Sequence, residues 1–279
     1  MSKYFQVSRA ESISSVNLRE AYSPLRVVSG SPIDTYYSRV ELLVVRAQQA
    51  QQANEEELIP LLFLRLISAT ESYVRDLLSR LPAICPLVWA HCSEQNMALG
   101  AAFHYGKSTL AMATLEHVSF STKGEVQKQS QKIAGVHVSS DGSLRVALDA
   151  FESISELRHS VVHSFDELFY KNLRELKALD SSGARFAVSI SPLLFQSFVA
   201  VCHSFVRAYN RFLLDSLLDS WLKNSLLAMD WRLDKERFEP VFSVFKSTRD
   251  GVGPANAYRA FQQFGRSATA LNGRAAAAP

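Results

Sequence analysis

Apolar residues recur at three- and four-residue spacing along residues 144–169, and this helical period constrains the fold more than any other feature of the chain. Residues at this spacing share one face of an α-helix, so the pattern predicts a long helix from Ser143 to about Leu179. Arg158 stands on the apolar face, where an arginine must be paired with an anion or used in chemistry. The full stripe contains Leu144, Leu148, Phe151, Ser155, Arg158, Val162, Phe165 and Phe169.

Two further helices are predicted nearer the N-terminus, and they are expected to form an antiparallel pair. The first begins at residues 31–34, where a serine caps the helix, a proline fills the first turn and an acid stands at the third position. It continues to about Gln52. The second runs from about residue 60 to residue 81, because Pro82 and Pro86 are expected to end it.

The region between this pair and residue 143 gives weaker signals. Residues 87–118 look helical but irregular, and residues 119–141 form a polar segment that is predicted to be flexible. This segment carries Lys123, Lys128 and Lys132, which are candidate RNA-binding residues because lysines on a loop can guide a phosphate backbone. The alternative is a solvated connection with no role in binding.

The C-terminal part of the chain also reads as mainly helical. A short alternating stretch at residues 185–190 is expected to be extended, and Ser191-Pro192 opens a long helix that continues to about residue 223. Beyond residue 227, aromatic and basic residues alternate; this pattern can bind nucleic acid, but it more simply indicates packing against the bundle. A glycine-rich turn at residues 251–254 precedes a last short helix, and residues 266–279 are expected to be a flexible tail.

Composition fits a folded protein of the cytoplasm. The chain has 279 residues, of which 47% are hydrophobic, so it is long enough to bury a substantial core. Its net charge of +3 permits a local nucleic-acid patch but is far from the strong basic excess of a dedicated binder. Cys85, Cys92 and Cys202 are too few for a disulfide framework and are expected to be free thiols. No apolar run approaches the roughly 20 residues that cross a bilayer, so no membrane partner is expected.

A polar face lies opposite the apolar stripe of the central helix and contains two histidines. Residues five apart are rotated by roughly 140° in a straight helix, so Arg158 and His163 cannot point the same way from one unbent helix. Two copies of the segment meeting across a dimer axis, or a distortion of the helix, would let them converge. The polar face comprises Glu152, Glu156, His159, His163, Glu167 and Tyr170.

The Arg158-x4-His163 motif late in a helical chain, preceded by the helix around Glu71, resembles the HEPN superfamily of the RiboL-PSP-HEPN type. The resemblance implies an all-α, antiparallel helical bundle with a long insertion and extra C-terminal helices. A HEPN-like domain is accordingly expected at residues 31–227. Outside it, where the resemblance does not reach, the sequence pattern predicts an irregular N-terminal arm at residues 1–30 and a helical extension at residues 228–265, followed by the tail.

The resemblance also implies a function, that of a metal-independent endoribonuclease without a cofactor. His163 would be the acid and base group, since a histidine titrates near neutrality, and Arg158 would hold the phosphate with its guanidinium. Attack by the ribose 2′-OH would leave a 2′,3′-cyclic phosphate. The implied partners are RNA, a second copy joined through the motif helix and a protein that inhibits or activates the enzyme. A toxin or antiviral role would follow.

Glu71 is the strongest supporting residue outside the motif. It shares a helical stripe with apolar residues, where a carboxylate is costly unless it is paired. Arg158 is one candidate partner, and Arg75, four residues along the same helix, is the other. His159 and Ser160, which directly follow Arg158, are expected to support the site.

Two other functions remain open from the sequence. Glu156, His159 and His163 lie on one helical face and could bind a transition metal in a metal-dependent hydrolase. Alternatively, the chain is a noncatalytic helical module that binds a partner protein, in which Arg158 forms a structural ion pair and His163 is simply exposed.

Overall fold

The computed structural model describes residues 15–24, 30–106, 109–138, 142–179 and 184–276, with side chains as far as residue 269. The protein is all-α, as predicted, with about 71% of the chain helical. The described strands are two short segments, β1 (Glu167–Leu168) and β2 (Phe186–Ala187), which pair antiparallel. In the described part of the chain, no helix combines the length and the apolar character needed to cross a membrane.

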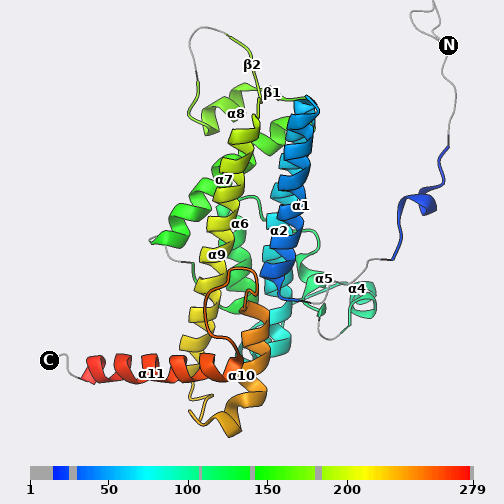
Figure 1. The fold of residues 1–279 in the computed structure, drawn as a ribbon. Coiled ribbons are helices and arrows are strands. Elements are labelled where there is room, and N and C mark those ends of the chain that lie inside the picture. Colours follow the sequence, from blue (N-terminus) through cyan, green and yellow to red (C-terminus); the bar gives the residue numbers. More distant parts are fainter. Residues whose placement is uncertain (1–14, 25–29, 107–108, 139–141, 180–183, 277–279) are drawn as a thin grey trace, which may run out of the picture.

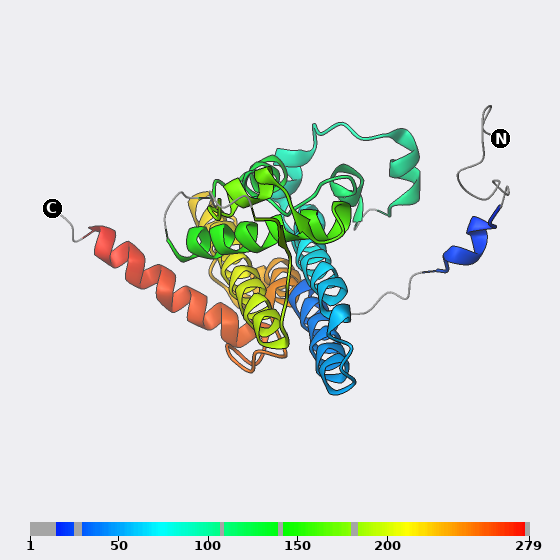
Figure 2. The ribbon, with the colours of Figure 1, turned by 90° about the horizontal axis from the view of Figure 1, so that it is seen from above.

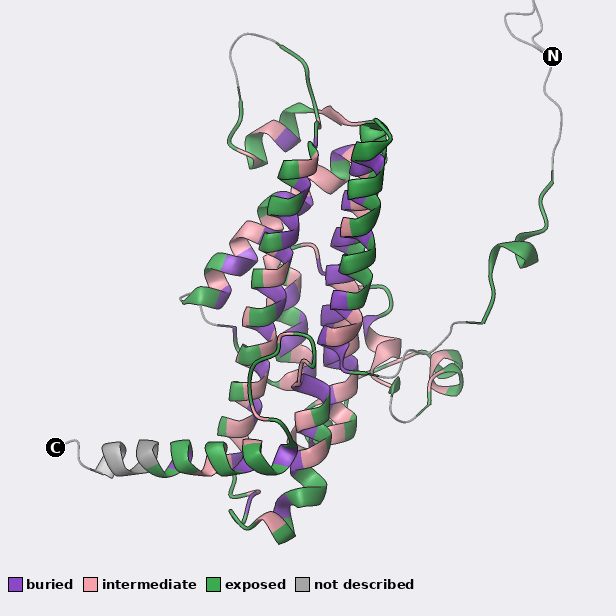
Figure 3. Ribbon diagram, viewed as in Figure 1, coloured by how far each residue is buried: buried purple, intermediate pink, exposed green. Residues whose placement is uncertain are grey.

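Four long helices form the body of the molecule: α1 (Pro32–Gln52), α2 (Ile59–Ile84), α7 (Ser143–His163) and α9 (Pro192–Lys223). Figure 1 shows α1, α2 and α9 side by side, with α7 crossing them at an angle. Helix α2 contacts each of the other three, so it lies at the centre of the bundle. The residues that face inward are buried along the whole length of these helices (Figure 3).

Aromatic side chains fill much of the core where α2, α7 and α9 meet. Phe63 is fully buried on α2, and the rings of Phe151 and Phe205 stack with centroids 4.8 Å apart. The buried Tyr209 hydroxyl lies 2.7 Å from Ser130 Oγ, so its polar atom has a hydrogen-bond partner. Burial and ring contacts of this kind hold α7 firmly on α2 and α9.

The predicted starts of two long helices are confirmed. The Ser31 hydroxyl accepts a hydrogen bond from the Asp34 N–H at 3.3 Å, and the Ser191 hydroxyl accepts one from the Leu194 N–H at 3.2 Å. The end predicted for α2 at Leu81 is wrong, because the helix continues through Pro82 to Ile84. A proline in the last turn removes only one hydrogen bond, so the helix passes Pro82 and ends at Ile84, where the extended Cys85 leads into Pro86.

The insertion between α2 and α7 is more ordered than the sequence predicted. It contains α3 (Pro86–Cys92), α4 (Leu99–His104), α5 (Met112–Leu115), α6 (Lys123–Gln129) and a π-helical turn at Ser130–Ala134. Most of the segment predicted to be flexible is therefore helical. Thr122 caps α6, and Val126 and Ile133 are buried, so an apolar face hidden among polar residues holds this segment on the bundle.

The central helix α7 is shorter than predicted: it ends at His163, not near Leu179. Phe165 and Asp166 adopt left-handed backbone angles, with φ of 48° and 69°, and the chain turns away into β1. The Ser160 carbonyl accepts hydrogen bonds from the Ser164 and Asp166 N–H groups, which closes the helix. Beyond the turn, α8 (Tyr170–Glu175) forms a separate short helix, and the extended stretch predicted at residues 185–190 contributes β2.

The C-terminal extension comprises α10 (Trp231–Phe245) and α11 (Ala257–Ala276). Phe238 is buried and contacts the ring of Phe261, so the aromatic residues of this region pack, as the simpler interpretation predicted. Helix α11 spans 20 residues and includes much of the segment expected to be a flexible tail. Figure 2 shows it extending away from the bundle.

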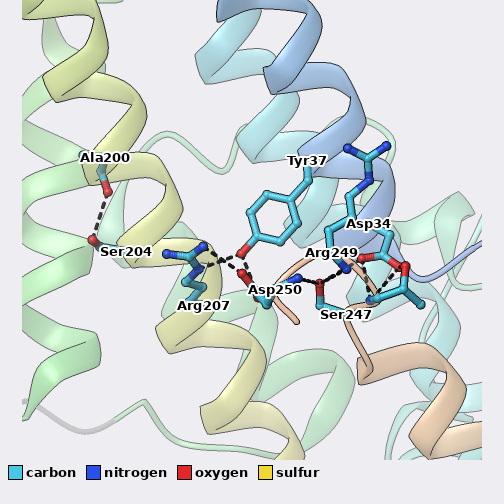
Figure 4. Close-up of polar contacts among 9 residues, drawn as sticks. Asp34, Tyr37, Ala200, Ser204, Arg207, Ser247, Arg249 and Asp250 are labelled. Atoms are coloured by element: carbon cyan, nitrogen blue, oxygen red, sulfur yellow. Dashed lines mark hydrogen bonds and ion pairs between the residues drawn. The ribbon is translucent and has the colours of Figure 1, made fainter. Parts of the chain in front are cut away.

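A group of polar contacts, the Asp34 clamp, ties the loop after α10 to α1 and α9 (Figure 4). The Asp34 carboxylate accepts hydrogen bonds from Ser247 Oγ at 2.9 Å and from the Thr248 hydroxyl at 2.7 Å and its N–H at 3.0 Å. Beside it, Arg207 lies 2.7 Å from Asp250. The clamp therefore fixes the C-terminal extension on the bundle.

We expect the Asp34→Asn variant to lose about 1 kcal/mol of stability at neutral pH, because it removes a charged acceptor. Partial burial raises the pKa of Asp34, but the hydrogen bonds from Thr248 and Ser247 outweigh it and hold the pKa below its usual value of 3.8. A lowered carboxyl pKa stabilises the fold above pH 3.8, and that stabilisation is lost as the pH falls through the folded-state value. Urea unfolding at several pH values should show that the difference in unfolding free energy between Asp34→Asn and wild type shrinks below about pH 3.8. The exposed Glu94→Gln variant is the control.

Candidate functional site

Glu71 and Arg158 form an ion pair that joins α2 to α7. Arg158 Nη1 lies 2.9 Å from Glu71 Oε1, and the Glu71 side chain is only 12% exposed, against 35% for Arg158. Because α2 and α7 pack together, residues 87 positions apart in the sequence meet here. This geometry answers the question the sequence left open: Arg158 is the partner of Glu71.

Arg75, the other candidate partner, has a different role. Its Nε donates to the Leu115 carbonyl at 3.1 Å, its Nη2 donates to the Val118 carbonyl at 2.6 Å, and its guanidinium lies 5.5 Å from the centre of the Phe120 ring. Arg75 therefore holds the segment before α6 against α2.

Through this segment, the structure adds two serines that the sequence analysis did not identify. Ser119 Oγ donates to Glu71 Oε1 at 3.4 Å, and Ser121 Oγ lies 3.0 Å from Ser119 Oγ. The Glu71 oxygen that pairs with Arg158 thus has a second polar neighbour. No local pattern around Ser119 could have revealed this contact, which depends on where Arg75 holds the segment.

The two histidines lie on the exposed side of α7, close to its C-terminal end. Their rings are 4.7 Å apart and inclined by 52°, and His163 is the last residue of the helix. Helix α7 is unbroken from Arg158 to His163, so the distortion that could have made them converge does not occur. Arg158 is turned toward α2, whereas His163 is turned toward solvent, and a single copy of the chain keeps them on different sides.

Ser160 is fully buried, which differs from the exposed position that direct contact with RNA would require. Its hydroxyl has no hydrogen-bond partner within the described residues. Its carbonyl, in contrast, accepts the hydrogen bonds that end α7 after His163. Ser160 therefore supports the site by fixing the end of the helix that carries both histidines.

The three lysines proposed for RNA binding lie on α6 and the turn after it, not on a flexible loop. Lys123 Nζ lies 2.8 Å from Asp149 Oδ1 and 3.6 Å from Glu152 Oε2, both on α7. Lys128 is exposed and lies 3.5 Å from Glu125, and Lys132 is half-buried. Lys123 thus holds α6 on α7, and its charge is already neutralised by two carboxylates.

The arrangement does not resemble a metal site. Glu156 is half-buried, whereas His159 and His163 are exposed about one and two turns further along α7. Throughout the residues that the structure describes, no three histidine, cysteine or acidic side chains are grouped so that they could hold a metal ion. The three residues that the sequence offered as ligands therefore do not form a binding cluster.

The site combines an anchored cation with exposed histidines. A guanidinium has five N–H donors, and the ion pair with Glu71 uses Nη1, so the partly exposed side of Arg158 keeps donors for an anion. The two exposed imidazoles follow Arg158 on the same helix, with their rings 4.7 Å apart. Comparison of the chain with known protein families, with curated proteins and with solved structures found no match.

Proposed function

We propose that the protein is an endoribonuclease of the HEPN type that cleaves RNA without a metal ion. The observation that supports the proposal most is the Glu71–Arg158 ion pair at 2.9 Å, which fixes a phosphate-binding group on the helix that also carries His163. The all-α fold and the exposed pair of histidines fit the same proposal. A role as a toxin or an antiviral effector, restrained or triggered by a partner protein, is part of it.

In the proposed reaction, His163 takes the proton from a ribose 2′-OH, and the resulting oxygen attacks the adjacent phosphorus. The phosphate passes through a more negative, five-coordinate state that the Arg158 guanidinium stabilises. The bond to the 5′ oxygen then breaks, a protonated histidine returns a proton to that oxygen, and a 2′,3′-cyclic phosphate remains. No co-reactant is needed, since the attacking group belongs to the substrate.

The placement of Arg158 and His163 on different sides of α7 favours a homodimer as the active species. If two copies met along the ends of their α7 helices, the arginine of one copy could face the histidine of the other. Both His159 and His163 are exposed, so the described residues leave the face of α7 that carries them open to a second copy. The second copy would then complete the site and not merely stabilise it.

Cleavage of RNA in excess EDTA tests the proposal. Purified protein should cleave an all-ribose strand and spare the same strand with 2′-deoxy sugars, because the attacking hydroxyl is then missing. Activity that EDTA abolishes and zinc or manganese restores would contradict the metal-independent mechanism. If neither strand were cleaved under any condition, the noncatalytic interaction module would be the better account of the Arg158 ion pair.

A further inference from the structure

Three aromatic side chains are exposed directly after the end of α7, and we call them the aromatic patch. Phe165 is 98% exposed, Phe169 is 53% exposed and Tyr170 is 67% exposed. Phe165 follows His163 by two residues, so their Cα atoms are at most about 7.6 Å apart. The patch therefore begins beside the histidine of the candidate site.

Both the backbone angle and the exposure of Phe165 are energetically unfavourable within its own chain. Its φ of 48° lies in the left-handed region, where a residue with a bulky side chain is strained and a glycine is not. The ring is also left almost completely in water, so packing against the described residues does not offset that strain. A strained, exposed aromatic residue beside a reactive group points to a contact with something outside the chain.

The turn that presents Phe165 is held rigidly. The Asp166 N–H donates to the Ser160 carbonyl at 3.3 Å, and the Asp166 carbonyl accepts from the Val188 N–H at 2.8 Å. Arg185 donates two hydrogen bonds to the Glu167 carboxylate, at 2.7 and 2.8 Å, which also neutralises that acid. These contacts hold the backbone of the turn in the conformation that leaves Phe165 exposed.

We propose that the aromatic patch stacks the unpaired bases of single-stranded RNA and so delivers the neighbouring phosphate to Arg158 and His163. This inference rests on the proposed function and names the substrate class of the same site. Aromatic rings accept any base face, but only a base that is not paired and stacked in a duplex can reach them. The exposed Lys171, directly after Tyr170, provides positive charge for the backbone of the strand.

Single-stranded binding can be measured without cleavage on the full-length His163→Ala protein, by fluorescence anisotropy with a labelled oligouridine. Adding Phe165→Ala should weaken binding roughly 5- to 150-fold, the loss expected for one stacked base. Phe165→Trp should retain binding, and the new indole should be quenched by the single strand but not by an RNA duplex. Val146→Ala, which removes an exposed apolar side chain from the other end of α7, should bind as the parent does.

Equal affinity of the alanine and tryptophan variants at position 165 would overturn the inference. So would a loss of binding that appears only together with a change from dimer to monomer, because the patch would then contact a second copy. Cleavage by wild-type protein separates the two proposals. If Phe165→Ala alone left both cleavage and binding at the wild-type level, the nuclease proposal would be supported and the base-stacking role of the aromatic patch would be contradicted. Quenching of the indole introduced by Phe165→Trp, without any cleavage by the wild-type protein, would contradict the nuclease proposal instead.

Discussion

Replacing His163 by alanine is expected to lower the rate of RNA cleavage by about 10²- to 10⁴-fold and to leave the fold intact. The residue ends α7 on its exposed side, and the ring contact described for it is with His159 at 4.7 Å. Truncation therefore removes little packing but takes away the proposed proton carrier. Initial rates on a labelled RNA strand, with wild type and variant at equal concentration, give the ratio directly.

His117→Ala is the matched control for this experiment. His117 is almost fully exposed and lies in the segment before α6, where its Nε2 is 3.2 Å from Glu116 Oε1. The His117→Ala variant should cleave RNA at the wild-type rate. Both His117→Ala and His163→Ala should unfold at the same urea concentration as the wild type. If His163→Ala also cleaved at the wild-type rate, the assignment of the catalytic residue would be wrong.

Replacing Arg158 by alanine is expected to affect both activity and stability. Cleavage should fall by about 10²-fold or more, because the group that holds the developing charge is lost. Stability should fall by about 1 to 2 kcal/mol, since Glu71 stays largely buried without its counter-charge; the partial exposure of Arg158 keeps the loss below that of a fully buried pair. Urea unfolding and cleavage rates measure the two effects separately.

Further variants separate the ion pair from the chemistry. Glu71→Gln removes the need for a counter-charge, so the loss of stability in the Glu71→Gln, Arg158→Ala double variant should be smaller than the sum of the single losses. Arg158→Lys should keep most of the stability but little of the activity, because an ammonium cannot form the two-pronged contact of a guanidinium. Arg145→Ala breaks another pair on α7, with Asp149 at 2.7 Å, and should leave cleavage unchanged. Additive losses of stability in the double variant, together with full cleavage activity in Arg158→Lys, would contradict the account.

The sequence predicted the features that follow from local chemistry and spacing. Ser31 and Ser191 cap α1 and α9 because serine followed by proline leaves few other options for the backbone. Arg158 stood on an apolar stripe and Glu71 on another, so each required an opposite charge. Their ion pair could be anticipated, although the rival partner Arg75 could be ruled out only from the packed helices.

The end of α7 could not be predicted, because the helical period continues by chance through Phe165 and Phe169. No glycine marks the turn, and the left-handed backbone at Phe165 and Asp166 depends on two hydrogen bonds of Asp166, which donates to the Ser160 carbonyl and accepts from the Val188 N–H. Residues assigned to a buried stripe are consequently exposed next to His163. The same limit applies to Ser119, whose contact with Glu71 depends on tertiary packing.

The chemistry of the cleaved ends tests the central claim most directly. Wild-type protein and the His163→Ala variant would be incubated with one defined RNA strand in excess EDTA, and the 3′ ends of the products identified by mass spectrometry. The account predicts 2′,3′-cyclic phosphate from the wild type and uncleaved strand from the variant. Products ending in a 3′-hydroxyl, or cyclic phosphate formed equally by both proteins, would contradict the roles assigned to the 2′-OH and to His163.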